Sequence, residues 1–519
     1  MQRLTAFIQK RYLIAVSLVA TLISVPGLFI DWSFVDDGVT VMISQKINDA
    51  VFHQKDLLSL LSLIIEPENG RVRSFYWLLQ WFFWLISENS AFLRHLYLLL
   101  MVLGISVISA WLIYKTIKNK LVAFFALSVW LINSGNSENW YRLGPQEIPL
   151  MLLLLSSLAL LLYSVDFFES SGKKRQPYFL LSLPLIPMAF YTKEIGMGYF
   201  GVIASTVCIL MVLKPFKYIN WARIWIYVVV TLLSSVSVVL LLIYVSSLKS
   251  GTYSAFYSIS QSGVVSGLKT YFTSLVRSIY PLSYIGIFGF LVWLFFYKKK
   301  RTEFFWIFFW VAWTAVFLMI QIPWGIPLPR YLLLASFGAS VVMVVGIHKL
   351  INFVRLNFSP KIYFLFILAL ATISARYVLY QSQDIYNYLE TQIVGTNVSQ
   401  DFLKYLSLNM QKGDRLVMNF PKNDVYLELV FETGLHLRTF YGRSDISLAY
   451  VQDVDKINHS DWIVGLKPHQ NIPIVMQYPQ KQSFFRITFF DVKQNQEIIR
   501  NIVSLKNWTQ TDTWYVQKE

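Results

Sequence analysis

The chain has 519 residues, of which 55% are hydrophobic and 17% aromatic, and its mean hydropathy is +0.50. Long apolar runs recur through the first three quarters of the sequence, and this excludes an ordinary soluble globular protein. The formal net charge of +16 fits lysines and arginines beside anionic lipid headgroups, so we expect membrane lipids as partners and no nucleic acid. The single cysteine, Cys208, excludes a disulfide framework and a zinc site built on thiolates.

The N-terminus has Arg3, Lys10 and Arg11 in front of an apolar stretch, as signal peptides do. No small-residue cleavage pattern follows, so we expect an uncleaved first span. Similar runs along the chain predict about eleven transmembrane helices. The predicted spans are 12–31, 91–114, 120–133, 147–166, 178–192, 195–213, 222–247, 273–297, 304–322, 330–350 and 360–380.

Three apolar segments are short for a full crossing of the bilayer. The runs 120–133 and 178–192 are either tilted or paired with a following half-helix. The aromatic run 75–86 is shorter still, and it is typical of an interfacial or re-entrant helix.

The loop charges predict the orientation of the spans. With the N-terminus in the cytoplasm, every strong basic cluster outside the 53–73 region falls on the cytoplasmic side, in agreement with the positive-inside rule. An odd number of spans then places the C-terminus outside. The basic clusters are Lys115/Lys118/Lys120, Lys173/Lys174/Arg175, Lys214/Lys217/Arg223, Lys298/Lys299/Lys300/Arg301 and Lys349/Arg355/Lys361.

The opposite face carries several loops with ionisable residues, and such loops can build a site at the membrane surface. They are 32–74, 134–147, 192–196, 249–272, 321–331 and the tail from about 385. In the tail, the pattern predicts a helix at 398–411 and strands at 415–420, 425–431, 461–466, 484–490 and 513–517. The predicted fold is thus an all-α polytopic membrane domain, residues 1–384, with a small α/β extracytoplasmic domain, residues 385–519.

An acidic pair, Asp36-Asp37, follows the first predicted span and precedes Gly38. One acid can act as a general base towards a hydroxyl while the other orients a substrate or holds a divalent cation such as Mg²⁺ or Mn²⁺. Asp-Asp-Gly is also good turn chemistry, and composition alone favours a solvated turn.

Arginines occur in two of the predicted outer loops. Arg71 and Arg73 lie just before the aromatic run 75–86, where they either clamp a phosphate or extend to lipid headgroups. Arg142 and Glu147 lie in Arg-Leu-Gly-Pro-Gln-Glu at the start of a span. This motif fits an anion site at a helix N-terminus and, equally, a capping turn.

Charged residues also join two pairs of apolar segments. Lys193-Glu194 lies in a tight connection, where charges usually face a cavity or the protein interior. The alternative is a self-neutralising pair, and the short preceding segment favours the functional interpretation. Arg330-Tyr331 opens a late span, where Arg330 either reaches a phosphate or anchors the interface.

These motifs, in this order, resemble the GT-C superfamily of membrane glycosyltransferases, which take sugar from a polyprenyl-phosphate carrier. Protein O-mannosyltransferases, the aminoarabinose transferase of lipid A and bacterial O-antigen-modifying glucosyltransferases are such enzymes. The segment 71–77 is similar to the GR-x-RPLYW pattern of bacterial members, and RLGPQE, TKE and Pro-Arg-Tyr recur in them. The sequence departs from the pattern at Ser74, where those members often have Pro, and at Asp37, where the mannosyltransferases have Glu.

The resemblance implies an inverting hexosyltransferase that needs a base for the acceptor hydroxyl and cations for the departing phosphate. It leaves open which acid is the base and whether the acids also hold a metal. The implied site is Asp36 and Asp37 as catalytic and metal-binding residues, Arg71, Arg73, Lys193 and Arg330 around the donor phosphate, and Arg142, Glu147, Glu194 and Tyr331 around substrate.

The expected partners are a polyprenyl-phosphate-linked sugar and a glycan or glycolipid acceptor. The Lys/Phe/Ile-rich composition with one Cys suggests a bacterial inner membrane with a periplasmic C-terminal domain, and O-antigen or a similar envelope glycan as acceptor. The alternatives are an O-antigen polymerase or ligase, or a polytopic lipid or polysaccharide transporter. A transporter usually shows internal repeats and mid-span charges, which this sequence lacks.

Overall fold

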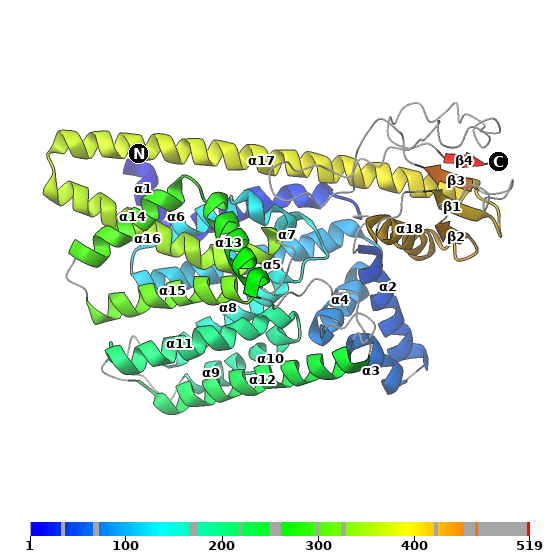
Figure 1. Cartoon of the computed structure of the whole chain (residues 1–519), viewed down its shortest axis with the longest axis horizontal. Coiled ribbons are helices and arrows are strands. Elements are labelled where there is room, and N and C mark those ends of the chain that lie inside the picture. Colours follow the sequence, from blue (N-terminus) through cyan, green and yellow to red (C-terminus); the bar gives the residue numbers. More distant parts are fainter. Residues whose placement is uncertain are drawn as a thin grey trace.

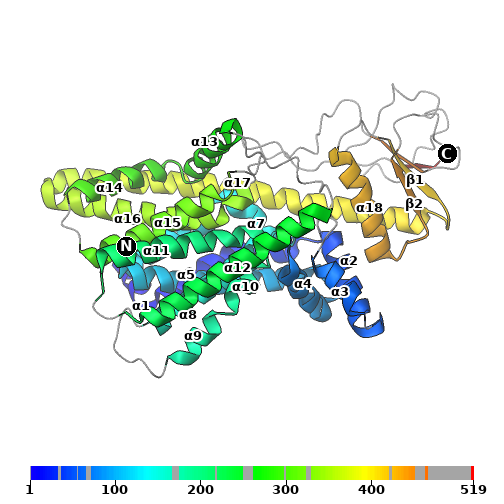
Figure 2. The same cartoon turned by 60° about the horizontal axis from the view of Figure 1, so that its bottom comes forward.

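A computed structural model of the chain shows a bundle of long helices with a small mixed domain at one end (Figure 1). Figure 2 shows the same arrangement after a 60° turn, which brings α12 from the lower side in Figure 1 to the front of the bundle. The structure describes residues 2–32, 37–54, 56–65, 72–165, 175–216, 219–248, 261–296, 300–322, 329–419, 424–450, 462–465 and 516–518.

In the described part of the first half of the chain, all regular elements are helices. Its elements are α1 (Gln2–Ser24), η1 (Val25–Phe29), α2 (Asp37–Asn48), η2 (Asp49–Gln54), α3 (Leu57–Ile65), α4 (Ser74–Ser87), α5 (Ala91–Ile117), α6 (Lys120–Leu131), η3 (Ser134–Asn136), α7 (Ser137–Tyr141), α8 (Glu147–Ser164), α9 (Gln176–Ser182), α10 (Leu185–Phe190), η4 (Glu194–Met197), α11 (Gly198–Leu213) and α12 (Trp221–Leu248).

The second half continues the bundle and ends in the mixed domain. Its helices are α13 (Gln261–Ser278), α14 (Leu282–Phe296), α15 (Arg301–Met319), η6 (Pro329–Leu332), α16 (Leu333–Asn357), α17 (Pro360–Asn409) and α18 (Asp424–Tyr441). Its strands are β1 (Arg415–Asn419), β2 (Ser447–Tyr450), β3 (Trp462–Gly465) and β4 (Val516–Lys518).

Within the described residues, eight helices are long and apolar enough to cross a membrane. A bent pair, α13 with α14, and two shorter apolar stretches, Lys120–Leu131 and Gln176–Phe190, correspond to the remaining predicted spans. The protein is therefore a multi-pass membrane protein, as the apolar runs predicted. The aromatic run predicted as a short helix forms α4.

The predicted span 273–297 is wrong as a single helix, and part of the predicted loop 249–272 is helical. α13 begins at Gln261 and ends at Ser278, and α14 starts at Leu282 at an angle of 99° to it. Pro281 lies in the break, and proline cannot donate a backbone hydrogen bond to a continuing helix.

Glycines allow very close packing of α14 on α16. A Cβ atom on Gly289 would lie 2.1 Å from the carbonyl oxygen of Gly346, and one on Gly346 would lie 2.1 Å from that of Gly286. Both distances are far below van der Waals contact, so only glycine fits. Small residues that let helix backbones approach are typical of packing inside membranes, where the hydrophobic effect gives little drive for helices to associate.

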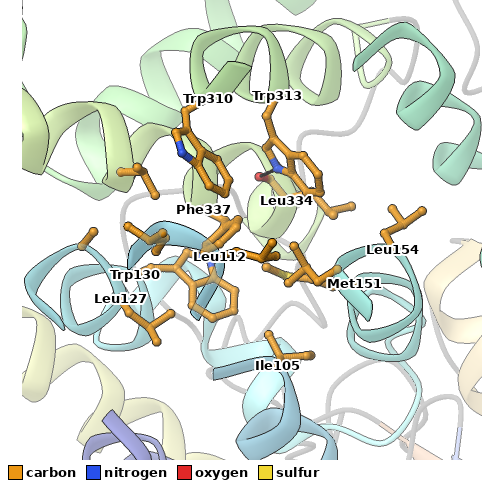
Figure 3. Packing of buried hydrophobic residues seen from close by; sticks show 14 of the residues in the cluster. Ile105, Leu112, Leu127, Trp130, Met151, Leu154, Trp310, Trp313, Leu334 and Phe337 are labelled. Carbon is orange, nitrogen blue, oxygen red and sulfur yellow. Dashed lines mark hydrogen bonds between the residues drawn. The ribbon is translucent and has the colours of Figure 1, made fainter. Parts of the chain in front are cut away.

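Buried tryptophans fix the start of α16 (Figure 3). The rings of Trp130 and Trp310 both pack edge-on against Phe337, with ring centroids 5.3 and 5.4 Å away. The indole N–H of Trp130 donates to the carbonyl of Leu333 at 3.1 Å, and that of Trp313 donates to the carbonyl of Leu334 at 2.9 Å. These bonds hold the first turn of α16, directly after η6.

The bundle has two distinct ends (Figure 1). The connections α11–α12, α14–α15 and α16–α17, at which predicted basic clusters occur, lie together at the left in Figure 1, and we call this the basic end. The mixed domain and α2–α4 lie at the other end, which we call the domain end. The helix ends at three of the five predicted basic clusters therefore lie on one side, while the common side of all five and its identity as cytoplasmic stay predictions.

The mixed domain contains a four-stranded sheet in the order β2-β1-β3-β4. β1 pairs in parallel with β2 and β3, and β4 pairs antiparallel with β3. The strands predicted at 415–420 and 461–466 are confirmed, and the one at 513–517 is confirmed in part as Val516–Lys518. The strand predicted at 484–490 lies outside the described residues.

The strand predicted at 425–431 is wrong, because this stretch belongs to α18. A short apolar run does not distinguish the repeat of a strand from the repeat of a helix. The helix becomes clear only from its continuation to Tyr441. The helix predicted at 398–411 is the end of α17, which runs without a break from the last span into the mixed domain. Arg443 donates to the carbonyls of Ser407 and Met410 at 2.5 and 2.9 Å and so satisfies the end of α17.

Candidate functional site

The structure describes eight of the ten predicted site residues, while Asp36 and Arg71 lie outside the described residues. Five of the eight lie in one group at the N-terminal ends of α8, α11 and α16. We call this group, together with Glu138, the charged cluster. Its members are Glu138, Arg142, Glu147, Lys193, Arg330 and Tyr331.

A buried ion pair forms one half of the charged cluster. Lys193, in the connection from α10 to η4, pairs with Glu147, the first residue of α8. The side chains are 7% and 0% exposed, and the Lys193 Nζ atom lies 4.5 Å from the ring centroid of Tyr331. The alternative of a self-neutralising Lys193–Glu194 pair is wrong, because Lys193 reaches Glu147 across helices. Burying two charges is costly, so such a pair points to a functional role.

Two arginines and one carboxylate form the other half. Arg330 and Arg142 both contact the Oε1 atom of Glu138, at 2.6 and 2.5 Å. The Arg330 guanidinium also lies over the ring of Tyr331, at 5.3 Å from its centroid. The Lys193 ammonium and the Arg330 guanidinium therefore both lie beside the ring of Tyr331. Three cations and two carboxylates give the charged cluster an excess of one positive charge.

Glu138 is a site residue that sequence reasoning missed. It stands four residues before Arg142 in α7, and an acid and a base at this spacing lie on one face of a helix. That spacing was the one signal for the pair. Nothing in the sequence indicated that Arg330, 192 residues further along the chain, binds the same carboxylate.

α7 and η6 are held together by a hydrogen bond to the backbone as well as by the Arg330–Glu138 ion pair. The Asn139 side-chain amide donates to the carbonyl of Arg330 at 3.1 Å. From α17, Tyr388 stacks on Tyr141 with ring centroids 6.2 Å apart, and it interacts electrostatically with Glu138. Tyr388 lies beyond the predicted last span, 360–380, so no sequence pattern pointed to it.

The start of α4 lies against the same loops. The backbone N–H of Phe75 donates to the carbonyl of Tyr191 at 3.0 Å, and the Tyr76 hydroxyl donates to the carbonyl of Gly144 at 3.1 Å. Arg73, which immediately precedes α4, is thereby brought to the connection that holds Lys193. The fold thus joins the segment with Arg73 to the charged cluster.

Asp37 is the first residue of α2 and is only 1% exposed, so the expectation of a solvated turn is wrong for this acid. It interacts electrostatically with Arg94 on α5. The next residue, Gly38, lies under α18 of the mixed domain, since a Cβ atom there would be 2.7 Å from Cδ2 of His436. The mixed domain therefore covers the acidic segment.

Glu194 opens η4 and is partly buried. Its Oε2 atom is buried without a hydrogen-bond partner among the described residues. The substrate contact predicted for Glu194 therefore stays a prediction, with a buried carboxylate oxygen free to make it.

The divalent cation expected at Asp36 and Asp37 stays a prediction. The described part of the chain contains no group of three or more His, Cys, Asp and Glu side chains that could hold a metal ion. Asp37 is the one carboxylate of the acidic pair that the structure describes. A single carboxylate is a poor ligand set for Mg²⁺ or Mn²⁺, so we derive no reaction step through a metal.

Solved structures with similar folds are known. ArnT from Cupriavidus metallidurans bound to undecaprenyl phosphate matches with a TM-score of 0.51 and 13% identity, over 86% of this chain and 87% of that chain. Its apo structure matches with a TM-score of 0.50 and 14% identity, over 89% and 93%. The archaeal oligosaccharyltransferase AglB from Archaeoglobus fulgidus, in complex with an inhibitory peptide and a dolichol-phosphate, matches with a TM-score of 0.50 and 12% identity, over 85% of this chain and 64% of that chain.

No family model and no curated protein matches the sequence. The likeness to ArnT and AglB extends over 86% and 85% of this chain. Both are GT-C proteins. The chain therefore has the GT-C fold that its short motifs predicted.

Proposed function

We propose that the protein is an inverting glycosyltransferase that moves a hexose from an undecaprenyl-phosphate carrier to an envelope glycan. The reaction takes place at the outer face of the bacterial inner membrane, and O-antigen or a similar glycan is the acceptor. The charged cluster, set in the GT-C fold, is the observation that carries this proposal. ArnT binds undecaprenyl phosphate and AglB binds a dolichol-phosphate, which supports a carrier of this chemical class.

The charged cluster suits a phosphate for three physical reasons. It has an excess of one positive charge, and its side chains are largely shielded from water, which strengthens their electrostatic interactions. It lies where α8 begins, and the N-terminus of a helix favours anions. In the proposal, Lys193, Arg330 and Arg71 or Arg73 hold the donor phosphate, and their carboxylate partners keep the cations in place before it binds.

The transfer needs only modest chemistry, because a phosphate is already a good leaving group. The acceptor oxygen forms a bond to the anomeric carbon as the bond from that carbon to the phosphate oxygen breaks. A carboxylate of the acidic pair, Asp36 or Asp37, takes the acceptor's proton, and the polyprenyl phosphate leaves with the electron pair. Direct attack inverts the anomeric centre, and Arg142, Glu147, Glu194 and Tyr331 complete the substrate contacts.

The proposal is tested with purified protein in lipid and a panel of undecaprenyl-phosphate sugars. Release of undecaprenyl phosphate is measured with and without cell-envelope glycans, for the wild type and for Asp36→Asn and Asp37→Asn. We expect release with one donor, dependent on the glycan and lost in at least one of the two variants. Asp56→Asn is the matched control, because Asp56 is an exposed acid near the same segment, and it is expected to leave release unchanged.

Two outcomes would overturn the proposal. The first is full transfer by both acid variants in a folded protein. The second is no release with any donor after glycans have been added, which would favour a polymerase, a ligase or a transporter.

A further inference from the structure

The helix α13 lies across the direction of the membrane spans. Its axis makes an angle of 99° with that of α14. Gly286 and Gly289 of α14 meet Met343 and Gly346 of α16, so α14 runs beside a helix that is long enough to cross a membrane. A helix at nearly a right angle to these two runs along the plane of the membrane.

α13 packs on the domain-side ends of the spans, and in Figure 2 it stands out from one side of the bundle. A Cβ atom on Gly267 would lie 2.5 Å from the carbonyl oxygen of Ile322, just beyond the end of α15. At the other end of α13, the Ser278 hydroxyl accepts from the Asn133 amide at 3.3 Å, and its carbonyl accepts from Gln381 at 3.2 Å. α13 also contacts η6, directly before α16. It is therefore fixed at the level where α15 ends and α16 begins, which is a surface of the membrane.

The residues of α13 form three different faces, at about 100° per residue. Tyr271 and Leu275 are buried against the bundle. The next face is apolar and exposed, and it consists of Val264, Val265, Leu268 and Phe272.

The third face of α13 is cationic. It carries Lys269 and Arg277, both exposed, and neither side chain makes a hydrogen bond or an ion pair with a described residue. α13 contains no Asp or Glu. The three faces match three surroundings, since one fits protein, one fits hydrocarbon and one fits water or anionic groups.

Aromatic residues at the bend between α13 and α14 indicate the same position. Tyr280 and Tyr284 are exposed, and their rings meet edge-on with centroids 5.7 Å apart. Tyrosines gather at the boundary between hydrocarbon and water, because the ring is apolar and the hydroxyl is polar. The bend therefore lies at that boundary, where an in-plane helix joins a spanning one.

We propose that α13 lies in the membrane–water interface at the domain end and binds the headgroups of anionic phospholipids through Lys269 and Arg277. The exposed apolar face contacts acyl chains, as in other interfacial helices. Two cations on a helix without acids attract anionic headgroups more strongly than zwitterionic ones. Because α13 contacts η6, the connection that carries Arg330 lies near the depth of the lipid phosphates.

The first test measures the depth of two faces of α13 in the full-length protein. Cys208→Ser removes the native cysteine, and Leu268→Cys or Ser266→Cys then carries a fluorophore in phosphatidylcholine vesicles. We expect the label of Leu268→Cys to be quenched by nitroxides on acyl chains and shielded from iodide. The label of Ser266→Cys, on the cationic side, should be open to iodide. Equal access of iodide to both labels, or acyl-chain quenching of both, would overturn the interfacial position.

The second test measures lipid preference beside the cations. The Ser266→Cys label is exposed to phosphatidylglycerol or phosphatidylcholine with the same nitroxide-bearing acyl chain. We expect phosphatidylglycerol to quench about threefold more or better, and high salt to reduce the difference. Lys269→Gln/Arg277→Gln should abolish the preference.

Lys404→Gln/Lys412→Gln is the matched control, because it removes two exposed cations from the end of α17 and the mixed domain. It should keep the preference for phosphatidylglycerol. Equal quenching by both lipids in the wild type, or an unchanged preference in Lys269→Gln/Arg277→Gln, would disprove the binding of anionic headgroups. Neither test depends on sugar transfer, so its outcome is independent of the proposed function.

Discussion

The two ends of the bundle each carry a lysine–glutamate pair that connects separate helices, and the pairs differ in burial. At the domain end, the side chains of Lys193 and Glu147 are 7% and 0% exposed. At the basic end, those of Lys349 and Glu303 are 20% and 32% exposed. The same two residue types therefore pair in an environment nearly shielded from solvent at the domain end and in a partly solvent-exposed one at the basic end.

This difference in burial implies a difference in role. An exposed pair costs little to form and contributes little, and Glu303 in the first turn of α15 gains some stabilisation from the helix dipole. A buried pair costs several kcal/mol in lost hydration, and apolar residues of similar size often stabilise a protein better. Its presence at the domain end is better explained by a need for charge there than by stability.

The largest effect is expected for Lys193→Met. It leaves Glu147 ionised in a buried site, which should destabilise the fold by about 3–5 kcal/mol and lower donor release about 10²-fold or more. The variant Lys193→Met/Glu147→Gln removes both charges and should recover stability but not activity. Thermal unfolding and the release assay measure the two effects separately. Recovery of activity in the double variant would show that the pair is purely structural.

The next largest effect is expected for Glu138→Gln. It takes from Arg330 and Arg142 the carboxylate that they share, so the two cations repel each other and lose their fixed positions. We expect a loss of about 1–3 kcal/mol and a rise of about tenfold in the KM for donor. Arg142→Met keeps the Arg330–Glu138 pair and should have a smaller effect on KM. Equal effects of the two variants would contradict the bridging role of Glu138.

A moderate effect is expected for Gly38→Ala, which tests how the mixed domain covers the domain end. The new Cβ atom would lie 2.7 Å from Cδ2 of His436 and 3.2 Å from Cδ2 of Leu435, so the side chains of α18 at this contact must shift. We expect a loss of about 1–3 kcal/mol and faster limited proteolysis of the mixed domain. Gly104→Ala is the control, since its Cβ atom would meet Leu152 at an ordinary 3.4 Å. Unchanged proteolysis would mean that α18 is not held at Gly38.

The smallest effect is expected for Lys349→Met at the basic end. Its partly exposed pair with Glu303 should contribute only about 0–1 kcal/mol, because water screens it. Donor release should stay at the wild-type level, measured beside Lys193→Met in the same membranes. A large loss of activity in Lys349→Met would remove the contrast between the two ends.

The sequence predicts the membrane part of the fold well, because an apolar run long enough to cross a bilayer rarely occurs in a soluble domain. It also predicts several members of the charged cluster, since Arg142, Glu147, Lys193 and Arg330 stand in loops on one predicted face. The bend between α13 and α14 was missed, although Pro281 marks it. Apolar content alone does not report a change in helix direction.

Contacts between distant segments could not be predicted. The bridging of Arg330 to Glu138 and the pairing of Lys193 with Glu147 depend on how helices meet in space. The partners in each pair come from different helices or connections, so the spacing of charges along the chain does not indicate which of them meet.

The 50-residue helix α17 connects the bundle to the mixed domain, and at 1.5 Å per residue it is about 75 Å long. Within the bundle, its residue Gln381 accepts from the backbone of Ser134 at 2.6 Å. Further along, Gln400 donates to the carbonyl of Trp32 at 3.2 Å and accepts from the Tyr441 hydroxyl at the end of α18.

Because α17 carries both Gln381 and Gln400, the number of helical residues between them sets the direction of one contact relative to the other. One residue inserted between them would turn the far contact point by about 100°, away from the segment that precedes the acidic pair. Seven inserted residues, close to two full turns, would restore the direction while moving the mixed domain outward by about 10 Å. The placement of α18 over Gly38 therefore depends on the length of α17 between these two contacts as well as on the side-chain contacts themselves.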